Sequence, residues 1–148
     1  MSLLMVVTQV KDEINNILKP ICEAEDVGVV FGPKSRTGPI KKRKFFRVMF
    51  EDQEFDDNVA QGSIEFELPI RLTINITSND PEKASDKSIM IISQVIDDII
   101  ENKRFRGVFG IQKVKLDQLI TGYPLDKQTN QMGSGIRLLL KIKLKSCR

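Results

Sequence analysis

Closely spaced carboxylates are the first candidates for chemistry in this sequence. Glu65 and Glu67 stand two positions apart, and Asp97 is followed directly by Asp98. Two carboxylates can divide general acid and general base work when their surroundings separate their pKa values. Nothing in the sequence around either pair predicts such a pocket, and a solvated strand or helix surface is the stronger interpretation. We therefore predict no catalytic residues.

The residue types that the chain lacks narrow the chemistry further. With no histidine among 148 residues, serine–histidine and cysteine–histidine nucleophiles and histidine-containing zinc sites are excluded. Cys22 and Cys147 lack metal-ligand spacing, so we expect free thiols. No glycine-rich phosphate loop or dinucleotide fingerprint is present. The sequence predicts a protein that is not an enzyme and uses no metal and no cofactor.

Composition indicates one ordinary globular domain over residues 1–148. Hydrophobic residues make up 41% and charged residues 29%, with a net charge of +3. No stretch approaches the roughly 20 apolar residues that span a bilayer, so no membrane partner is expected. Neither a repeat nor a low-complexity tract divides the chain.

Hydrophobic periodicity predicts two helices and five strands in the order α-β-β-β-α-β-β. That order is typical of an α+β fold, with a single antiparallel (possibly mixed) sheet and two helices packed on one face. Pro20 is expected to end or kink the first helix, and Asp80-Pro81-Glu82 to start the second. The elements are helix 3–18, strands 27–31, 45–50 and 64–76, helix 80–102, and strands 108–120 and 136–144, with a polar loop at about 121–135.

The strand at 64–76 reads IEFELPIRLTINI and alternates apolar and polar residues throughout. At about 3.3 Å per residue it would reach roughly 40 Å, against a usual strand of about five or six residues. Pro69 cannot donate a ladder hydrogen bond and belongs at an edge, bulge or bend. We expect one overlong strand or hairpin that extends past the body of the domain.

Opposite charges are segregated on either side of the strand at 45–50. An exposed basic loop at about 32–44 precedes the strand, and an acidic segment follows it. Within one subunit the two segments could neutralise each other; in a head-to-tail ring, the basic patch of one copy could meet the acidic patch of the next. A third interpretation is phosphate binding by the 34–47 segment, with Phe45 or Phe46 as a stacking platform. The candidate interface or docking residues are Lys34, Arg36, Lys41, Lys42, Arg43, Lys44, Glu51, Asp52, Glu54, Asp56 and Asp57.

Four consecutive stretches together resemble one protein family. They are LPIRLTINI, SNDPEKASDKSIMIISQVIDDII, GVFGIQKVKLDQLITG and IRLLLKIKLK. In this order they are similar to the tail terminator (tail completion) proteins of long-tailed phages and prophages. The resemblance covers about residues 3–144 and rests on element order and patterning rather than on a signature motif.

The resemblance implies a structural role. Such proteins form a hexameric ring that stops tail-tube polymerisation and presents a surface to the head connector. The expected partners are copies of the chain itself, tail-tube and connector proteins, and DNA that passes through the channel without specific recognition. The expected location is the virion tail, and the host cytoplasm during assembly. Glu65, Glu67 and Arg71, on the polar side of the long strand, would face the channel. Another head-tail joining (neck) component, or a small nucleic-acid-binding module, is the alternative.

Overall fold

The computed structural model describes residues 3–32, 44–51, 55–56, 62–126 and 131–145. Two helices and six strands occur in these ranges. Of the predicted interface residues, Lys34, Arg36, Lys41, Lys42, Arg43, Asp52, Glu54 and Asp57 lie outside them. The elements are α1 (Leu3–Glu25), β1 (Gly28–Phe31), β2 (Lys44–Phe50), β3 (Phe55–Asp56), β4 (Ser63–Thr77), α2 (Pro81–Glu101), β5 (Ile111–Asp126) and β6 (Gln131–Lys145).

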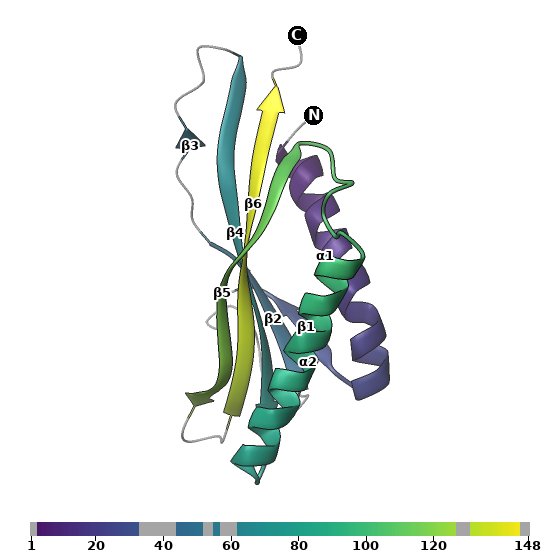
Figure 1. Ribbon diagram of the computed structural model, residues 1–148, viewed down its shortest axis with the longest axis vertical. Helices are drawn as coiled ribbons and strands as arrows, with labels where there is room; N and C mark the ends of the chain where they lie inside the picture. Colours follow the sequence, from purple (N-terminus) through teal and green to yellow (C-terminus); the bar gives the residue numbers. More distant parts are fainter. Residues whose placement is uncertain (1–2, 33–43, 52–54, 57–61, 127–130, 146–148) are drawn as a thin grey trace.

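The strands form one sheet in the order β1-β2-β4-β6-β5, with the short β3 paired to β4. β1 is parallel to β2, and the other pairs are antiparallel. Figure 1 shows the long strands β4, β6 and β5 running side by side along the long axis of the molecule. The α+β class is therefore confirmed, and the sheet is mixed.

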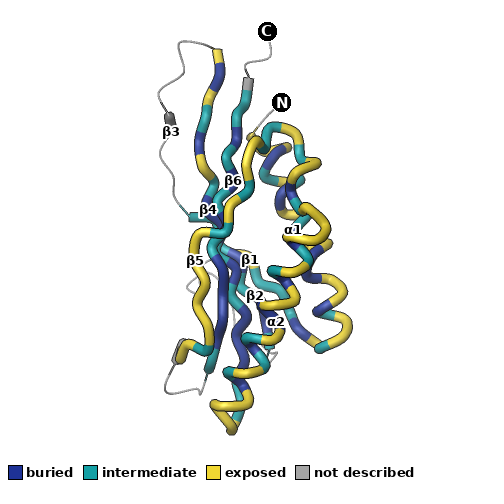
Figure 2. The backbone as a smooth tube through the Cα atoms, viewed as in Figure 1, coloured by how far each residue is buried: buried dark blue, intermediate teal, exposed yellow. Residues whose placement is uncertain are grey.

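Both helices and one set of alternating strand residues contribute to a single hydrophobic core. Register explains how the strands share it, because Val48, Leu72 and Ile136 stand side by side on β2, β4 and β6. Figure 2 shows buried residues concentrated in the central strands and along one side of each helix, whereas β5 is mostly exposed. The helix residues in the core are Val6, Val10, Ile14, Ile17, Leu18 and Ile21 of α1 and Ala84, Ile91, Ile92, Val95 and Ile99 of α2.

The predicted end of the first helix at Pro20 is wrong, because α1 continues to Glu25. Proline removes one backbone donor, which leaves the carbonyl of Asn16 without its helical partner. Asn16 and Pro20 are both exposed, so water can satisfy that carbonyl. Leu18 and Ile21 are buried on either side of the proline and hold both parts of the helix against the core.

Pro69 lies where β4 changes partners, in agreement with the expectation that it avoids a ladder donor position. β2 pairs with β4 as far as Phe50 opposite Ile70, and β3 begins opposite Phe66. The Pro69 carbonyl accepts from the Glu51 backbone N–H at 2.9 Å. In an antiparallel strand the N–H and C=O of one residue point to the same side, so the missing proton of Pro69 would face the gap between β2 and β3.

The predicted polar loop at 121–135 is a second correction, since β5 extends to Asp126 and β6 begins at Gln131. The small residues Gly133, Ser134 and Gly135 belong to β6 and are not part of a loop. A Cβ at Gly135 would stand 2.9 Å from the Leu72 carbonyl oxygen, so only glycine fits beside β4. The buried Ser134 hydroxyl lies 2.8 Å from that of Ser88 on α2 and accepts from the Gly122 N–H at 2.9 Å.

Two smaller boundaries also differ from the sequence interpretation. The fourth predicted strand begins at Ile111 rather than Val108, because residues 102–110 form turns. The connection after β2 contains the two-residue β3. The start of α2 agrees with prediction: the Asp80 carboxylate accepts from the Lys83 N–H at 3.3 Å, and Pro81 opens the helix.

Candidate functional site

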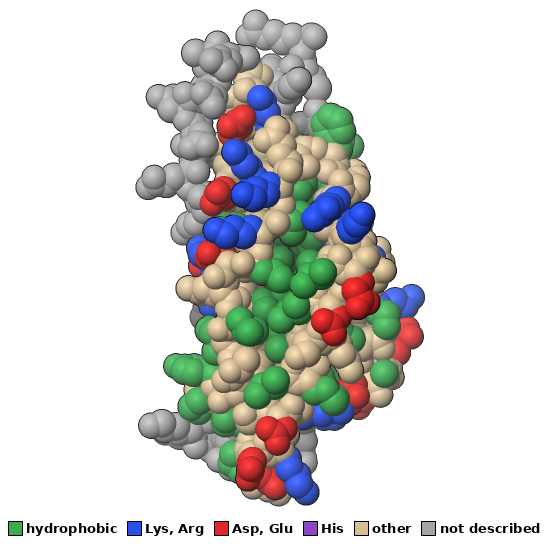
Figure 3. Space-filling view, in the orientation of Figure 1, with side chains coloured by type: hydrophobic (Ala, Val, Ile, Leu, Met, Phe, Trp, Pro, Cys, Tyr) green, Lys and Arg blue, Asp and Glu red, His purple; other side chains and the backbone are tan. Residues whose placement is uncertain are grey.

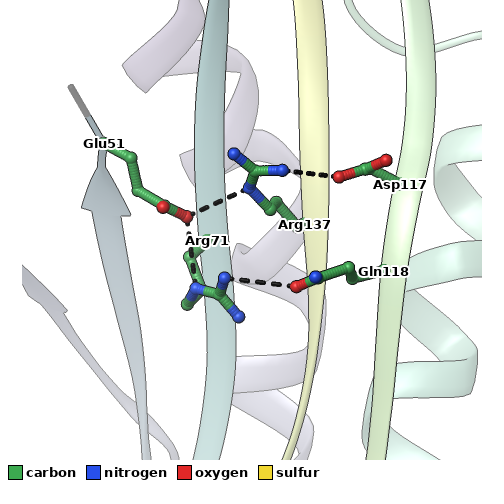
Figure 4. A network of polar contacts seen from close by, with 5 residues as sticks. All are labelled: Glu51, Arg71, Asp117, Gln118 and Arg137. Carbon is green, nitrogen blue, oxygen red and sulfur yellow. Dashed lines mark hydrogen bonds and ion pairs between the residues drawn. The ribbon is translucent and has the colours of Figure 1, made fainter. Parts of the chain in front are cut away.

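A cluster of charged side chains crosses the sheet on the face that carries Arg71, named here the polar face. Arg71 of β4 and Arg137 of β6 are direct neighbours in register. The Glu51 carboxylate, just beyond β2, lies between them and accepts from Arg71 Nε at 3.2 Å and Arg137 Nε at 3.3 Å. Figure 4 shows the cluster spanning these strands to β5.

The cluster continues to the edge of the sheet through β5. Arg71 Nη2 donates to Gln118 Oε1 at 3.2 Å, and Arg137 Nη1 donates to Asp117 Oδ2 at 2.5 Å. The hydrogen bond to Asp117, together with Glu51, raises the pKa of Arg137 above its usual value. Both guanidinium groups therefore donate hydrogen bonds to side chains of the same chain. The cluster of Glu51, Arg71, Asp117, Gln118 and Arg137, called here the clasp, links neighbouring strands and is not an open anion-binding site.

Glu65 and Glu67, predicted to face a channel, stand directly opposite lysines on the polar face. Glu65 is in register with Lys143 and Glu67 with Lys141. Lys143 Nζ lies 3.4 Å from Glu65 Oε1. Lys113 on β5 is in turn the neighbour of Lys141. This end of the polar face therefore mixes both signs of charge.

Three predicted interface residues fall within the described ranges. Glu51 is engaged by Arg71 and Arg137, which belong to β4 and β6 and not to the basic segment. Neutralisation of the acidic segment by the basic one therefore stays a prediction. Lys44 begins β2 opposite Ile76. Asp56 belongs to β3 and is in register with Glu65. The structure does not bring Lys44 together with Glu51, since they lie at opposite ends of β2.

The predicted stacking platform is not available in this fold. Phe46 is fully buried in the core, and Phe45 is buried as well. Arg47 lies over the Phe45 ring, 5.6 Å from its centroid, and donates to the Gly32 carbonyl at 3.0 Å. Burial lowers the pKa of Arg47. Neither phenylalanine ring has a face free to stack on a base.

The sequence interpretation missed an exposed apolar group on β5. Leu119, Ile120 and Tyr123 are 58%, 40% and 54% exposed. Figure 3 shows apolar side chains gathered over the region of β5 and α2, with lysine and arginine nearer one end. The signal is hidden in sequence because β5 shifts register four times against β6, which breaks the alternation that would mark these positions.

The described ranges contain neither a metal-binding cluster nor a membrane-spanning helix. No group of three or more histidine, cysteine, aspartate or glutamate side chains there could hold a metal ion. Neither helix in the described part of the chain is long and apolar enough to cross a membrane.

Comparison with known proteins adds no family. The sequence matches no protein-family model, and a search of curated proteins found no relative.

Proposed function

We propose that this chain is a non-enzymatic structural subunit that assembles with its own copies into a ring, as the resemblance to phage tail terminators implies. In that role the ring would end a tail tube and join it to the head or neck. It would work in the virion tail, after assembly in the host cytoplasm. The observation that carries the proposal is the length of the strands relative to the helices.

Strands β4, β5 and β6 contain 15, 16 and 15 residues, whereas α1 and α2 contain 23 and 21. At about 3.3 Å per strand residue the strands reach roughly 50 Å. At 1.5 Å per helix residue the helices reach only about 32–35 Å. Neither helix alone can therefore cover the whole length of these strands, and Figure 1 shows the start of β4 and the end of β6 reaching beyond both helices.

The uncovered length supports contact with other copies. Ile64, near the start of β4, belongs to the apolar alternation of that strand yet is 37% exposed. A neighbouring subunit that packs on this end of β4 would bury Ile64. We propose that β4 and β6 form an overlong ribbon that neighbouring copies or the tail tube complete.

The mass of the purified chain tests this function. Light scattering across a wide concentration range should show a transition from single subunits to an assembly of about six copies. Negative-stain microscopy should show the assembly as a ring. A single subunit at every concentration, even beside tail tubes, would contradict the proposal. Salt-dependent binding of DNA by single subunits would favour the nucleic-acid alternative instead.

A further inference from the structure

The sheet is open, with β1 at one edge and β5 at the other. An edge strand offers unpaired backbone N–H and C=O groups to any strand that approaches it, and proteins usually protect such edges. Among the described strands, β5 is the long edge at 16 residues and β1 the short edge at four.

Charge protects only the first half of β5, whereas the second half has a register shift after Ile120 and a proline at position 124. Lys113 and Lys115 are exposed in the first half, and charged edge residues discourage pairing with a foreign strand. Residues 118–124 read QLITGYP and contain no charge. This second half also carries the exposed Leu119, Ile120 and Tyr123. The uncharged part of the edge is therefore short and apolar.

The other edge exposes an apolar residue at the same height in the sheet. Register across the strands gives one row that contains Phe31, Val48, Leu72, Ile136 and Leu119. The row below it contains Val30, Arg47, Thr73, Gly135 and Ile120. Phe31 is 37% exposed, so each end of the first row presents an apolar side chain to solvent.

Strand direction also suits a contact between the two edges. β5 is antiparallel to β6 and therefore parallel to β4, whereas β1 is parallel to β2 and therefore antiparallel to β4. If a second copy continued the sheet in the same orientation, its β1 would run antiparallel to β5. Phe31 of that copy would then meet Leu119, and its Val30 would meet Ile120.

We infer that β1 of one copy adds to residues 119–122 of β5 in the next copy, and that this is the subunit contact of the ring. The inference rests on the proposed function. A second copy is the occupant because the same chain supplies both apolar edges, at one height and in opposite directions. Pairing of β5 with another β5 would leave the β1 edge and Phe31 uncovered. The contact is heterologous, so it repeats until the ring closes.

Disulfide trapping tests the contact directly, because paired antiparallel residues have Cα atoms within the reach of a disulfide. In a Cys22→Ala and Cys147→Ser background, a chain with both Phe31→Cys and Leu119→Cys should give a ladder on a non-reducing gel. The ladder should extend to about six copies. Neither single-cysteine chain should cross-link alone, and an equal mixture of the two should give dimers only.

The matched control pairs Phe31→Cys with Lys113→Cys. Lys113 lies on the same edge, six residues or roughly 20 Å from Leu119, beyond disulfide reach, so no ladder should form. Dimers from the Leu119→Cys chain alone would overturn the inference in favour of β5–β5 pairing. If light scattering shows assemblies but no cross-link forms, the proposed contact is wrong and the proposed ring is not contradicted. If the chain is a single subunit at every concentration, both the proposed ring and the proposed contact are wrong.

Discussion

At the residue scale, the clasp on the polar face offsets the repulsion between two neighbouring arginines on β4 and β6. Arg71 and Arg137 are direct cross-strand neighbours, and like charges in that position are destabilising. Glu51 accepts hydrogen bonds from both arginines, and Asp117 accepts one from Arg137. The two carboxylates therefore neutralise the two positive charges locally. The side chains of Glu51, Arg71 and Arg137 are one-quarter to one-third exposed, so solvent weakens each attraction.

Glu51→Gln should therefore lower the free energy of unfolding by about 1 kcal/mol, because it removes the charge that separates two arginines and keeps the shape. Urea denaturation at a concentration where the chain is a single subunit measures the change. Glu23→Gln, at an exposed position of α1, is the matched control and should change stability by less than about 0.5 kcal/mol. Equal effects of the two substitutions would show that the clasp is worth nothing beyond a surface charge.

Sequence reasoning found the charged residues of this site but not their partners. Glu51 and Arg71 were singled out as contacts with other molecules, whereas Arg137, Asp117 and Gln118 were not singled out. The partners depend on strand order, which places β6 between β4 and β5, and on the register shift between Leu116 and Gln118. Neither property is local, so no periodicity in the sequence could have predicted them.

At the element scale, the parts of the fold with local causes were predictable. The start of α2 follows from the capping residues Asp80 and Pro81, and the bounds of β4 follow from strict alternation. The hairpin of β5 and β6 was predicted too short because its far half contains Gly133, Ser134 and Gly135. Those residues are typical of a loop in sequence. In the fold, Gly135 leaves room for β4 and Ser134 forms a hydrogen bond with Ser88 of α2. Tertiary packing therefore overrides local preference there.

Helix α1 makes a separate prediction, because its proline costs one hydrogen bond without ending the helix. Pro20→Ala should raise the free energy of unfolding by about 1–2 kcal/mol, since alanine restores the donor to Asn16 and the freer unfolded chain offsets part of the gain. Thermal and urea unfolding measure the difference. Lys19→Ala, at the adjacent exposed position, should change stability by less than about 0.5 kcal/mol. No gain from Pro20→Ala would mean that the two parts of α1 do not act as one helix.

At the scale of the whole molecule, the charges of the polar face determine whether DNA could slide through the centre of the proposed ring without binding to it. An acidic lining would let DNA slide, but Glu65 and Glu67 each face a lysine across the ladder. If this face lines the channel, the glutamates balance Lys143 and Lys141 and keep the lining close to neutral. Their replacement by lysine would leave a continuous basic patch on β4 and β6.

The double substitution Glu65→Lys and Glu67→Lys should therefore make the proposed ring bind double-stranded DNA, with affinity that falls steeply as salt rises. Fluorescence anisotropy of a labelled duplex across a salt series measures this binding, and light scattering checks that the ring persists. Asp97→Lys with Glu101→Lys is the control, because it adds the same charge at exposed positions of α2. Equal binding by both variants would mean that net charge alone is responsible and that the polar face does not line the channel. Binding by the strand variant alone would place Glu65 and Glu67 on the path of the DNA, where each carboxylate offsets a neighbouring lysine.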